Sequence, residues 1–356
     1  MINYYELGPD KRLNEIVFAG SHDAGVTFGS SNTQTQDLDV LGQATAGVRL
    51  FDIRITAAVV KKGPASDVIA LKAYHGVGPS GKKTGIDIRT GQTEKPKVKS
   101  LWGGEYGMTL TKILNDSSKF VATNPTEFII LKFDHCENWD MIAEACVSVL
   151  GDRIYQGGGN LNTKTLRQLQ GKVIVVFAKV EAVRQAYPPA SGILGIKNLY
   201  GGKATYDDRY DGLQYFGKGG TPTWKPFGKI DQNIKKQSKL MRQGGDGNPN
   251  VMGMMYWTTT GIFESIRDRD TGMWSQPNVQ RMKDMWNNGL NEAITSRMNK
   301  FSKIDGFDKG TVLKAFMPNI VMIDFADEQK CKHILELNTI APTFLVKQMQ
   351  NFHLLG

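Results

Sequence analysis

The sequence has few cysteines, no long apolar run and no leader-like start. Only three of its 356 residues are Cys, and such an odd, sparse set does not supply a disulfide framework. No Cys/His spacing indicates a zinc site. No apolar run reaches the roughly 18 residues of a membrane-spanning helix. Residues 1–6 lack the basic region and apolar core of a secretory signal peptide. These absences point away from disulfide-rich secreted domains and from membrane-spanning proteins.

What is present is the composition of a folded, basic protein. Apolar residues make up 40% and charged residues 22%, which is ordinary for a globular protein with a sizeable core. The net charge of +9 favours anionic partners, either nucleic acid or an acidic lipid surface. The length allows one large domain or two, and we interpret residues 1–356 as a single domain because no linker, repeat or low-complexity tract interrupts them.

Polar motifs follow three short apolar runs near the start of the chain. The runs are Glu15–Ala19, Val48–Phe51 and Val68–Tyr74, and their β-branched and aromatic residues predict strands. The motifs at their ends are Ser21-His22-Asp23, Phe51-Asp52-Ile53-Arg54 and Tyr74-His75-Gly76. The carboxyl ends of parallel barrel strands meet at one mouth, so we expect these motifs to lie together. Two His, two Asp and one Arg would make an acid–base site with a clamp for an anion.

Strands and helices alternate along most of the chain. This alternation predicts an α/β fold, a single distorted (β/α)8 TIM barrel that is irregular in its second half. Residues 182–250 show no clear elements, and a terminal helix over Lys332–Phe352 should break or kink at Pro342. The further segments expected to form barrel strands are Phe128–Phe133, Val173–Phe177, Val251–Thr258 and Asn319–Phe325.

The three motifs resemble the X-region of bacterial phosphatidylinositol-specific phospholipase C, a family of the phospholipase-C-like phosphodiesterases. Gly20–Gly25 is similar to the family pattern G-T-H-D-S-G, Arg49–Arg54 to R-x-F-D-I-R, and Tyr74-His75-Gly76 to H-H-G. The order and spacing are also similar, and the later predicted strands extend the resemblance over nearly the whole chain. The resemblance implies a distorted TIM barrel, in agreement with the alternation of elements.

The resemblance also implies a reaction. The inositol 2-hydroxyl of phosphatidylinositol attacks phosphorus, diacylglycerol leaves and inositol 1,2-cyclic phosphate forms. Two imidazoles can supply the base and the acid near neutral pH. The family's pattern assigns the general base to His22 and the general acid to His75. Each imidazole needs a carboxylate that sets its tautomer and stabilises its cation.

The remaining catalytic positions carry over in the same way. Asp324, after the last predicted strand, is implied as the partner of His22, and Asp23 as the partner of a second imidazole, His75. Arg54 would hold a non-bridging phosphate oxygen, because a guanidinium grips phosphate through two parallel hydrogen bonds. Asp52 would orient either Arg54 or the attacking hydroxyl.

Substrate binding is implied by a second group of residues. Asp208 and Tyr210 resemble the family's D-x-Y motif, whose Asp binds inositol hydroxyls and whose Tyr stacks on the ring. A turn-forming Asp and a packed Tyr would give the same pattern. Lys179 aligns with a family Arg that contacts inositol hydroxyls. Lys132 and Asp134 share one face of their predicted strand, since side chains alternate along it, and both are candidates for contact with the headgroup.

Asp134 departs from the bacterial pattern. The family has a Lys near this position, whereas the eukaryotic phospholipases C have a Ca²⁺-binding acid there. Ca²⁺ requires several oxygen ligands, and the guanidinium of Arg54 would oppose a cation. We therefore expect no metal and no cofactor, with Asp134 pairing with Arg54 or an inositol hydroxyl. A Ca²⁺-dependent phosphodiesterase of the same superfamily stays open as an alternative. Tyr74 is a second departure, since the family has His there.

The expected partners are phosphatidylinositol and an anionic membrane surface, and the expected state is a monomer. The basic stretches 82–99 and 225–242 would attract acidic lipid, or they are simply solvated loops. Four aromatic residues are candidates for membrane insertion, although they could equally pack in the core: Trp102, Trp224, Phe227 and Trp274.

Location and activity have alternatives. The resemblance implies a secreted or peripheral membrane protein, but with no signal peptide a cytoplasmic location stays open. A nuclease would also be basic and carry two His, yet no nucleic-acid-binding motif is present, so we expect no nucleic acid partner. An inactive barrel that binds inositol lipids is the other alternative.

Overall fold

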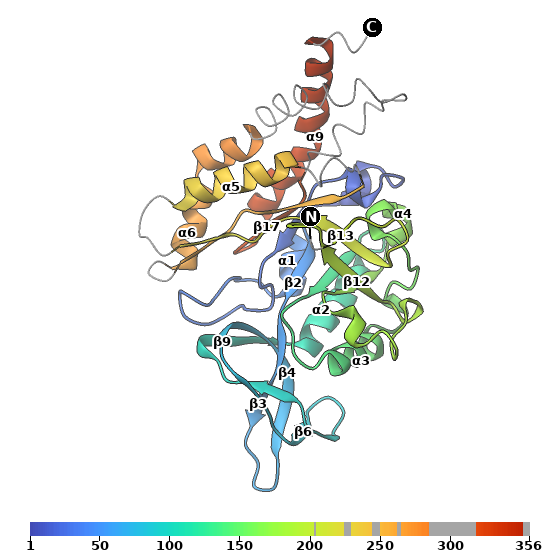
Figure 1. Ribbon diagram of the computed structural model, residues 1–356, viewed down its shortest axis with the longest axis vertical. Helices are drawn as coiled ribbons and strands as arrows, with labels where there is room; N and C mark the ends of the chain where they lie inside the picture. The colour runs from blue at the N-terminus through green and yellow to red at the C-terminus, as the bar shows by residue number, and fades with distance from the viewer. Residues whose placement is uncertain (203, 224–228, 244–249, 262–264, 285–317, 352–356) are drawn as a thin grey trace.

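The computed structural model describes residues 1–202, 204–223, 229–243, 250–261, 265–284 and 318–351. Within them, a closed barrel forms the centre of the molecule (Figure 1). Every pairing between neighbouring barrel strands is parallel, and the strands follow one another in chain order until the last pairs with the first. The predicted TIM-type barrel is therefore confirmed. Its strands are β1 (Phe18–Ser21), β2 (Val48–Ile53), β10 (Ile129–Phe133), β11 (Val173–Phe177), β12 (Ile193–Asn198), β13 (Gly212–Phe216), β15 (Met252–Tyr256) and β17 (Pro318–Ile323).

The first half of the barrel is a regular succession of strands and helices. Between β1 and β2 lies α1 (Val40–Ala46), which the Asp39 side chain caps by accepting from the Gly42 amide. It ends at Gly47, whose φ of +129° suits glycine. Helix α2 (Leu110–Thr123) precedes β10, and α3 (Trp139–Leu150) and the short α4 (Leu166–Leu169) precede β11.

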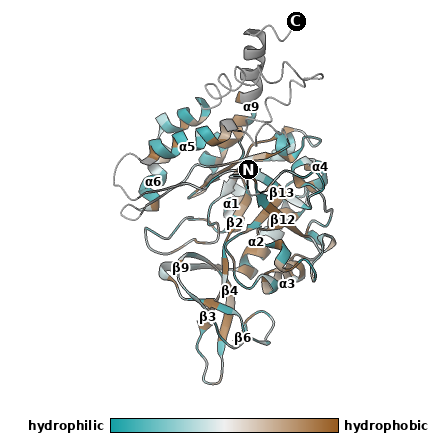
Figure 2. Ribbon diagram, viewed as in Figure 1, coloured by the Kyte–Doolittle hydropathy of each residue, from teal (hydrophilic) through white to brown (hydrophobic). Residues whose placement is uncertain are grey.

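The second half contains strands that the sequence analysis missed. Residues 182–250 were expected to be irregular, but they hold β12, β13, β14 (Thr221–Thr223) and α5 (Lys229–Gln243). Among the described residues only 3₁₀ turns separate β11 from β12, and no helix separates β12 from β13. Strands were predicted mainly where apolar runs alternate with helical patterns. No helical pattern flanks these short strands, so the sequence did not indicate them. Figure 2 shows β12 as largely hydrophobic and α5 as hydrophilic.

The outer helices of the second half lie on the side of the molecule away from β4 (Figure 1). Helix α6 (Ile266–Met273) follows β15 and the short β16 (Thr259–Gly261), which pairs with β14. The last helix, α9 (Glu328–Asn351), continues past Pro342, so the expected break does not occur. The helical pattern over 278–301 lies mostly outside the described residues. In the part of the chain that the structure describes, no helix is long and apolar enough to cross a bilayer.

A second sheet projects from the barrel where β2 ends. It contains the run Val68–Tyr74, which we expected in the barrel, and this expectation was wrong. Only Arg54 separates β2 from β3, and β4 pairs with β3 in the antiparallel direction, with Ile55 opposite Ala73. A tight antiparallel return leaves no room for the long crossover that a parallel barrel strand needs. Its strands are β3 (Ile55–Lys61), β4 (Asp67–Val77), β5 (Ser80–Lys82), β6 (Gly85–Asp87), β7 (Thr93–Glu94), β8 (Lys97–Lys99) and β9 (Trp102–Thr109).

A buried ion pair joins the start of the barrel to its outer layer. Arg49 on β2 is fully buried, and its Nε lies 2.5 Å from Glu127 Oε2. Its other nitrogens donate to the carbonyls of Ala44, Val48 and Ile2 at 2.8–2.9 Å. Each of the three guanidinium nitrogens of Arg49 thus has a hydrogen-bond acceptor. Arg49 of the sequence motif therefore has a structural position away from the mouth.

We expect Arg49→Met and Glu127→Leu each to lower the free energy of unfolding by about 3–5 kcal/mol, since each leaves one buried charge unpaired. The double variant should recover most of this loss, because both charges are then removed. Chemical denaturation measures all three. The exposed pair Arg167–Asp10 provides the control: Arg167→Met should leave the unfolding midpoint almost unchanged. A double variant as unstable as the singles would contradict the assignment.

Candidate active site

The first element of the site is an imidazole at the end of β1. His22 follows β1 directly, and Asp324 follows β17, the strand that pairs with β1. Their parallel register brings the two side chains together, with His22 Nδ1 2.9 Å from Asp324 Oδ1. With Nδ1 donating to the carboxylate, Nε2 is the nitrogen left to exchange a proton with a substrate. The pair implied by the sequence resemblance is present.

The second element is a carboxylate shared by two imidazoles and a guanidinium. Asp23 is buried, and its Oδ2 lies 2.7 Å from His75 Nδ1 and 3.8 Å from His22 Nε2. Its Oδ1 lies 2.8 Å from Arg54 Nε. Asp23 has a φ of +44°, a left-handed conformation that directs the side chain into the mouth at a cost in backbone strain. The site therefore has one central carboxylate, with two imidazoles and one guanidinium around it.

His75 reaches this cluster by an unexpected route. It lies inside β4 of the side sheet, opposite Glu105 of β9, and not at the end of a barrel strand. The side sheet starts at Arg54, so β4 returns alongside the barrel mouth. The side chain of His75 is 21% exposed and that of Arg54 is 26% exposed, whereas Asp23 is fully covered. His75 and Arg54 are thus the members of the cluster whose side chains reach the solvent.

The charges of this cluster shift its proton affinities. Burial opposes the charged form of His22, but the carboxylates of Asp23 and Asp324 outweigh it and raise the pKa of His22 to about 9. Burial likewise opposes ionisation of Asp23, yet Arg54, His22 and His75 together lower its pKa well below the usual range. The Asp23 carboxylate raises the pKa of Arg54 above its ordinary value, against the effect of burial.

A second ion pair lines the inside of the barrel. Lys132 on β10 stands opposite Asp52 on β2 in the strand register, and Nζ lies 2.6 Å from Asp52 Oδ1 and 3.3 Å from Asp134 Oδ2. Asp52 was expected to orient Arg54 or the attacking hydroxyl, and Asp134 to pair with Arg54 or an inositol hydroxyl. In the structure both carboxylates pair with Lys132, because β10 and β2 are direct neighbours, and the contacts with hydroxyls stay predictions. Burial lowers the pKa of Lys132, but the carboxylates of Asp52 and Asp134 and the nearby tyrosines together raise it well above its ordinary value.

Two tyrosines complete the wall across the barrel, and the sequence analysis did not single them out. Tyr256 at the end of β15 presents its ring edge to His22, with 6.3 Å between ring centroids. Tyr215 on β13 and Tyr256 are both within electrostatic reach of Lys132. Burial raises the pKa of both phenols, so they are neutral hydrogen-bonding groups. Only the alternation of β15 could have indicated Tyr256, and β13 was missed altogether.

Three side chains of the site lie close enough together to be compared with a metal site. Among the described residues, one atom each from His22, Asp23 and Asp52 lies within 4.8 Å of the others, close enough to hold an ion. Each carboxylate, however, already has an internal cation: Arg54 beside Asp23, and Lys132 beside Asp52. A divalent ion would have to displace or repel both. This donor set does not fit a Ca²⁺ site.

Two expected headgroup residues lie outside the mouth. Asp208 is exposed, and Tyr210 packs on the outside of the barrel, where its hydroxyl fills the space over Gly195 of β12. Without a helix between β12 and β13, the connection runs back along the outer surface, and these residues come just before β13 begins. Their assignment to the site was therefore wrong. Lys179 is exposed just after β11, at the mouth end of that strand.

The aromatic residues expected at the membrane differ in their exposure to solvent. Trp102 is 68% exposed, and it pairs across β9 and β4 with Val77, which is 69% exposed. Trp274 is half-buried and stacks on His333 of α9, while Trp224 and Phe227 lie outside the described residues. Residues 229–242 of the second basic stretch form helix α5, not a loop. The first basic stretch, also expected as a loop, forms strands β5 to β8.

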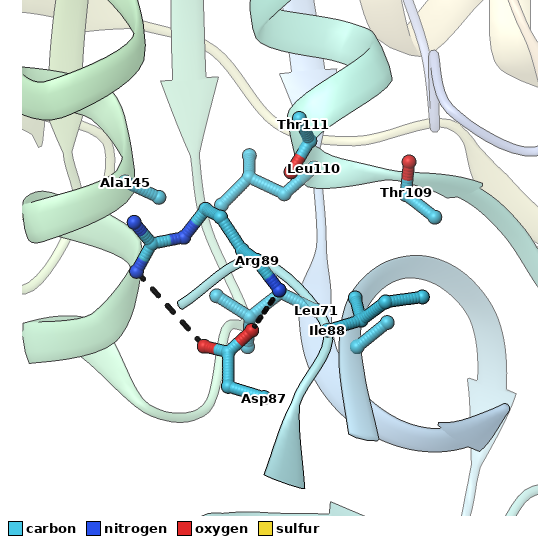
Figure 3. A pocket seen from close by; sticks show the side chains of 9 residues that line it. Leu71, Asp87, Ile88, Arg89, Thr109, Leu110, Thr111 and Ala145 are labelled. Carbon is cyan, nitrogen blue, oxygen red and sulfur yellow. Dashed lines mark hydrogen bonds and ion pairs between the residues drawn. The ribbon is translucent and has the colours of Figure 1, made fainter. Parts of the chain in front are cut away.

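A cavity of about 380 Å³ lies away from this cluster, between the side sheet and helices α2 and α3 (Figure 3). Leu71 and Ile88 line it, and Arg89 crosses it to bind Asp87 and Glu144. None of the catalytic candidates lines it. The charged groups of the candidate site converge on Asp23 and not on this cavity.

Comparisons with known proteins bear on the fold. No protein-family model and no curated protein sequence matches the chain. Solved structures do. Phosphatidylinositol-specific phospholipase C from Listeria monocytogenes is 15% identical, with a TM-score of 0.51 over 93% of this chain and 95% of that chain. A double mutant of the Staphylococcus aureus enzyme is 16% identical, with a TM-score of 0.55 over 94% and 96%. The chain therefore has the fold of the bacterial phosphatidylinositol-specific phospholipases C.

Proposed function

We propose that this protein is a phosphodiesterase of the phosphatidylinositol-specific phospholipase C type, which needs no metal. The observation that carries the proposal is the arrangement around Asp23. The Nδ1 atom of His22 contacts Asp324, and the Nδ1 atom of His75 contacts Asp23. The guanidinium of Arg54 also contacts Asp23, the carboxylate that lies near both imidazoles. This set can supply a base, an acid and a phosphate clamp. Residues 1–356 would act as one catalytic unit and as a monomer.

In the first half of the reaction, His22 acts as general base. Its Nε2 removes the proton of the inositol 2-hydroxyl, and the oxygen forms a bond to phosphorus. Asp324 stabilises the imidazolium that results, as a carboxylate does in a catalytic triad. Arg54 donates to a non-bridging phosphate oxygen, where negative charge grows in the transition state.

In the second half, His75 acts as general acid. The bond from phosphorus to the diacylglycerol oxygen breaks, and His75 Nε2 gives that oxygen its proton. Asp23, which lies 2.7 Å from Nδ1, orients the imidazole of His75 so that Nε2 faces the leaving oxygen. The products are diacylglycerol and inositol 1,2-cyclic phosphate. Lys132, Asp52 and Asp134 would bind inositol hydroxyls inside the barrel, with Lys179 at the rim.

The same proposal includes docking on an anionic bilayer beside the site. Val77 lies two residues beyond His75 on β4, and together with Trp102 it forms an exposed apolar pair. Residues 55–109, which form the side sheet, contain nine Lys or Arg against four Asp or Glu. An interfacial Trp with basic residues around it is typical of a surface that rests on acidic lipid. Such docking would bring a headgroup directly to His75.

The test of the proposed activity is phosphorus NMR on phosphatidylinositol vesicles. Wild-type protein should produce a cyclic phosphate signal, in the presence of EDTA as well as in its absence. His22→Ala and His75→Ala should each lower turnover at least about 10²–10⁴-fold, the usual contribution of general acid–base catalysis.

His333→Ala serves as the control, since this residue lies on α9 away from the mouth, and its turnover should stay near that of wild type. Binding to the vesicles with no product from wild-type protein would favour an inactive lipid-binding barrel. Activity lost in EDTA and restored by Ca²⁺ would replace the metal-free mechanism.

The pH profile should report His22. A general base works in its neutral form, so kcat/KM should rise with pH as His22, whose pKa is about 9, loses its proton. It should fall again at the pH where the general acid loses its proton, which gives a bell-shaped profile. Asp324→Asn removes one of the carboxylates that raise the pKa of His22. The rising limb should therefore move to lower pH, together with a lower maximum. Asp140→Asn, on the surface of α3, is the control and should leave the limb in place; an unmoved limb in Asp324→Asn would argue against His22 as the base.

Membrane docking can be separated from chemistry. Trp102→Ala should weaken binding to vesicles that contain anionic lipid and lower turnover on them, while hydrolysis of a short water-soluble substrate changes little. Binding of wild-type protein should weaken with salt, because surface charges are screened beyond about 8 Å at physiological ionic strength. Val60→Ser removes an exposed apolar residue of β3 that is far along the sheet from His75, and it should have no effect. Equal losses on both substrates for Trp102→Ala would exclude a docking role.

A further inference from the structure

The turn that carries Asp324 is held from behind by a buried ammonium group. Lys330, in the first turn of α9, donates to the Phe325 carbonyl at 2.7 Å and to the Asp324 carbonyl at 3.1 Å. Its third donor goes to Asp270 Oδ2 on α6 at 2.5 Å. Lys330 and Asp270 are only 8% and 9% exposed, and Asp324 is 2% exposed. Two helices thus meet on the backbone of the residue that binds His22.

The turn needs such support because its backbone is unfavourable. Phe325 has a φ of +43°, a left-handed conformation that is strained for a residue with a bulky side chain. The surroundings hold it at several points. The Phe325 amide donates to the Thr35 carbonyl at 2.8 Å, and the guanidinium of Arg267 lies 4.1 Å from the centre of its ring. Arg267, like Asp270, belongs to α6, so one face of this helix covers the turn.

The partner imidazole is tied to the same turn through a glutamine. Gln36 Nε2 donates to the His22 carbonyl at 2.9 Å, and its Oε1 accepts from the Ala326 amide at 2.9 Å. The backbones of His22 and of the turn are therefore joined through the side chain of Gln36. Gln36 does not fix the orientation of the Asp324 side chain. That orientation depends on the backbone of Asp324 and Phe325, whose two carbonyls Lys330 binds.

Asp270 is the buried carboxylate that keeps Lys330 in place. Burial raises the pKa of Asp270 to about 7 against the opposing effect of Lys330, so Asp270 is an anion in the range around pH 9 in which His22 titrates. Asp327 Oδ2 lies 3.7 Å from Lys330 Nζ, farther than Asp270, and its side chain is 51% exposed. An exposed carboxylate at that distance contributes little to fixing a buried ammonium. Neither Asp270 nor Lys330 contacts the place where substrate would bind, so any influence they have on the reaction acts through Asp324.

We infer that Asp270 and Lys330 are positioning residues, which hold the Asp324–Phe325 turn in the conformation that directs the Asp324 carboxylate to His22. This inference rests on the proposed function for its catalytic meaning. Helix α6, distant in sequence from every motif of the mouth, would then set the geometry of the general base. The sequence analysis gave neither residue a role.

The deciding variant removes both charges at once. Asp270→Asn/Lys330→Met leaves the net charge near Asp324 unchanged, so a shift in the titration of His22 reports geometry and not lost charge. The measurement is an NMR pH titration of the His22 imidazole in the full chain without substrate, with Asp324→Asn as the reference for a broken pair. We expect the double variant to lower the His22 pKa by most of the shift that Asp324→Asn causes. Its kcat should fall about 10- to 100-fold with KM nearly unchanged, the size of effect that a small misplacement of a catalytic group causes.

The matched control is Glu328→Gln/Lys332→Met, an exposed ion pair at 2.7 Å on the same helix, which should leave the His22 titration and kcat unchanged. If the double variant does not fold, Lys330→Arg and Lys330→Gln replace it. The Arg variant, which keeps the charge and the donors, should retain the His22 pKa, and the Gln variant should lower it.

An unchanged His22 titration in a folded double variant, or equal titrations of His22 in the Arg and Gln variants, would overturn the inference. The titration needs no turnover. Wild-type protein without phosphodiesterase activity but with the expected shift would therefore refute the proposed function and leave the positioning role standing.

Discussion

The buried carboxylate of Asp23 is the interaction on which the site depends. One oxygen lies 2.8 Å from the Arg54 guanidinium and the other 2.7 Å from His75. A buried carboxylate is costly unless cations and hydrogen bonds compensate it. The compensation here comes from three segments that are separate in the sequence. The charge of Asp23 therefore draws β1, β2 and β4 to one point, and it also contributes to the raised proton affinity of His22.

The transition from barrel to side sheet explains how this point can exist. Arg54 is the single residue between β2 and β3, so the chain leaves the barrel at its mouth and returns along β4. His75 stands within β4 of the side sheet, where it pairs with β9, while His22 stands on the barrel itself. The two imidazoles thus reach Asp23 from different sheets. The exposed pair of Val77 and Trp102 lies next to His75 as a result of the same geometry.

Much of the fold could be predicted from local patterns. The runs that became β2, β10, β11, β15 and β17 are short, apolar and β-branched, and they were placed within a few residues of their observed bounds. The strands β12 and β13 were missed, because no periodic helix separates them. Glycines within and beside both strands also shorten their apolar runs. Because β12 and β13 were missed, Asp208 and Tyr210 could not be placed on the connection between these two strands. A motif match there could not reveal that the connection returns on the outside of the barrel.

The sequence by itself determined which side chains end the strands: His22, Arg54 and Asp324 each follow an apolar run, and their order resembles one family. Residue chemistry and strand propensity are local, so they can be read locally. Only the tertiary structure decided the partners. Lys132 binds Asp52 because β10 lies beside β2, and His75 reaches Asp23 because β4 folds back on β3. Those pairings depend on strand neighbours and connection lengths far along the chain, which no local pattern contains.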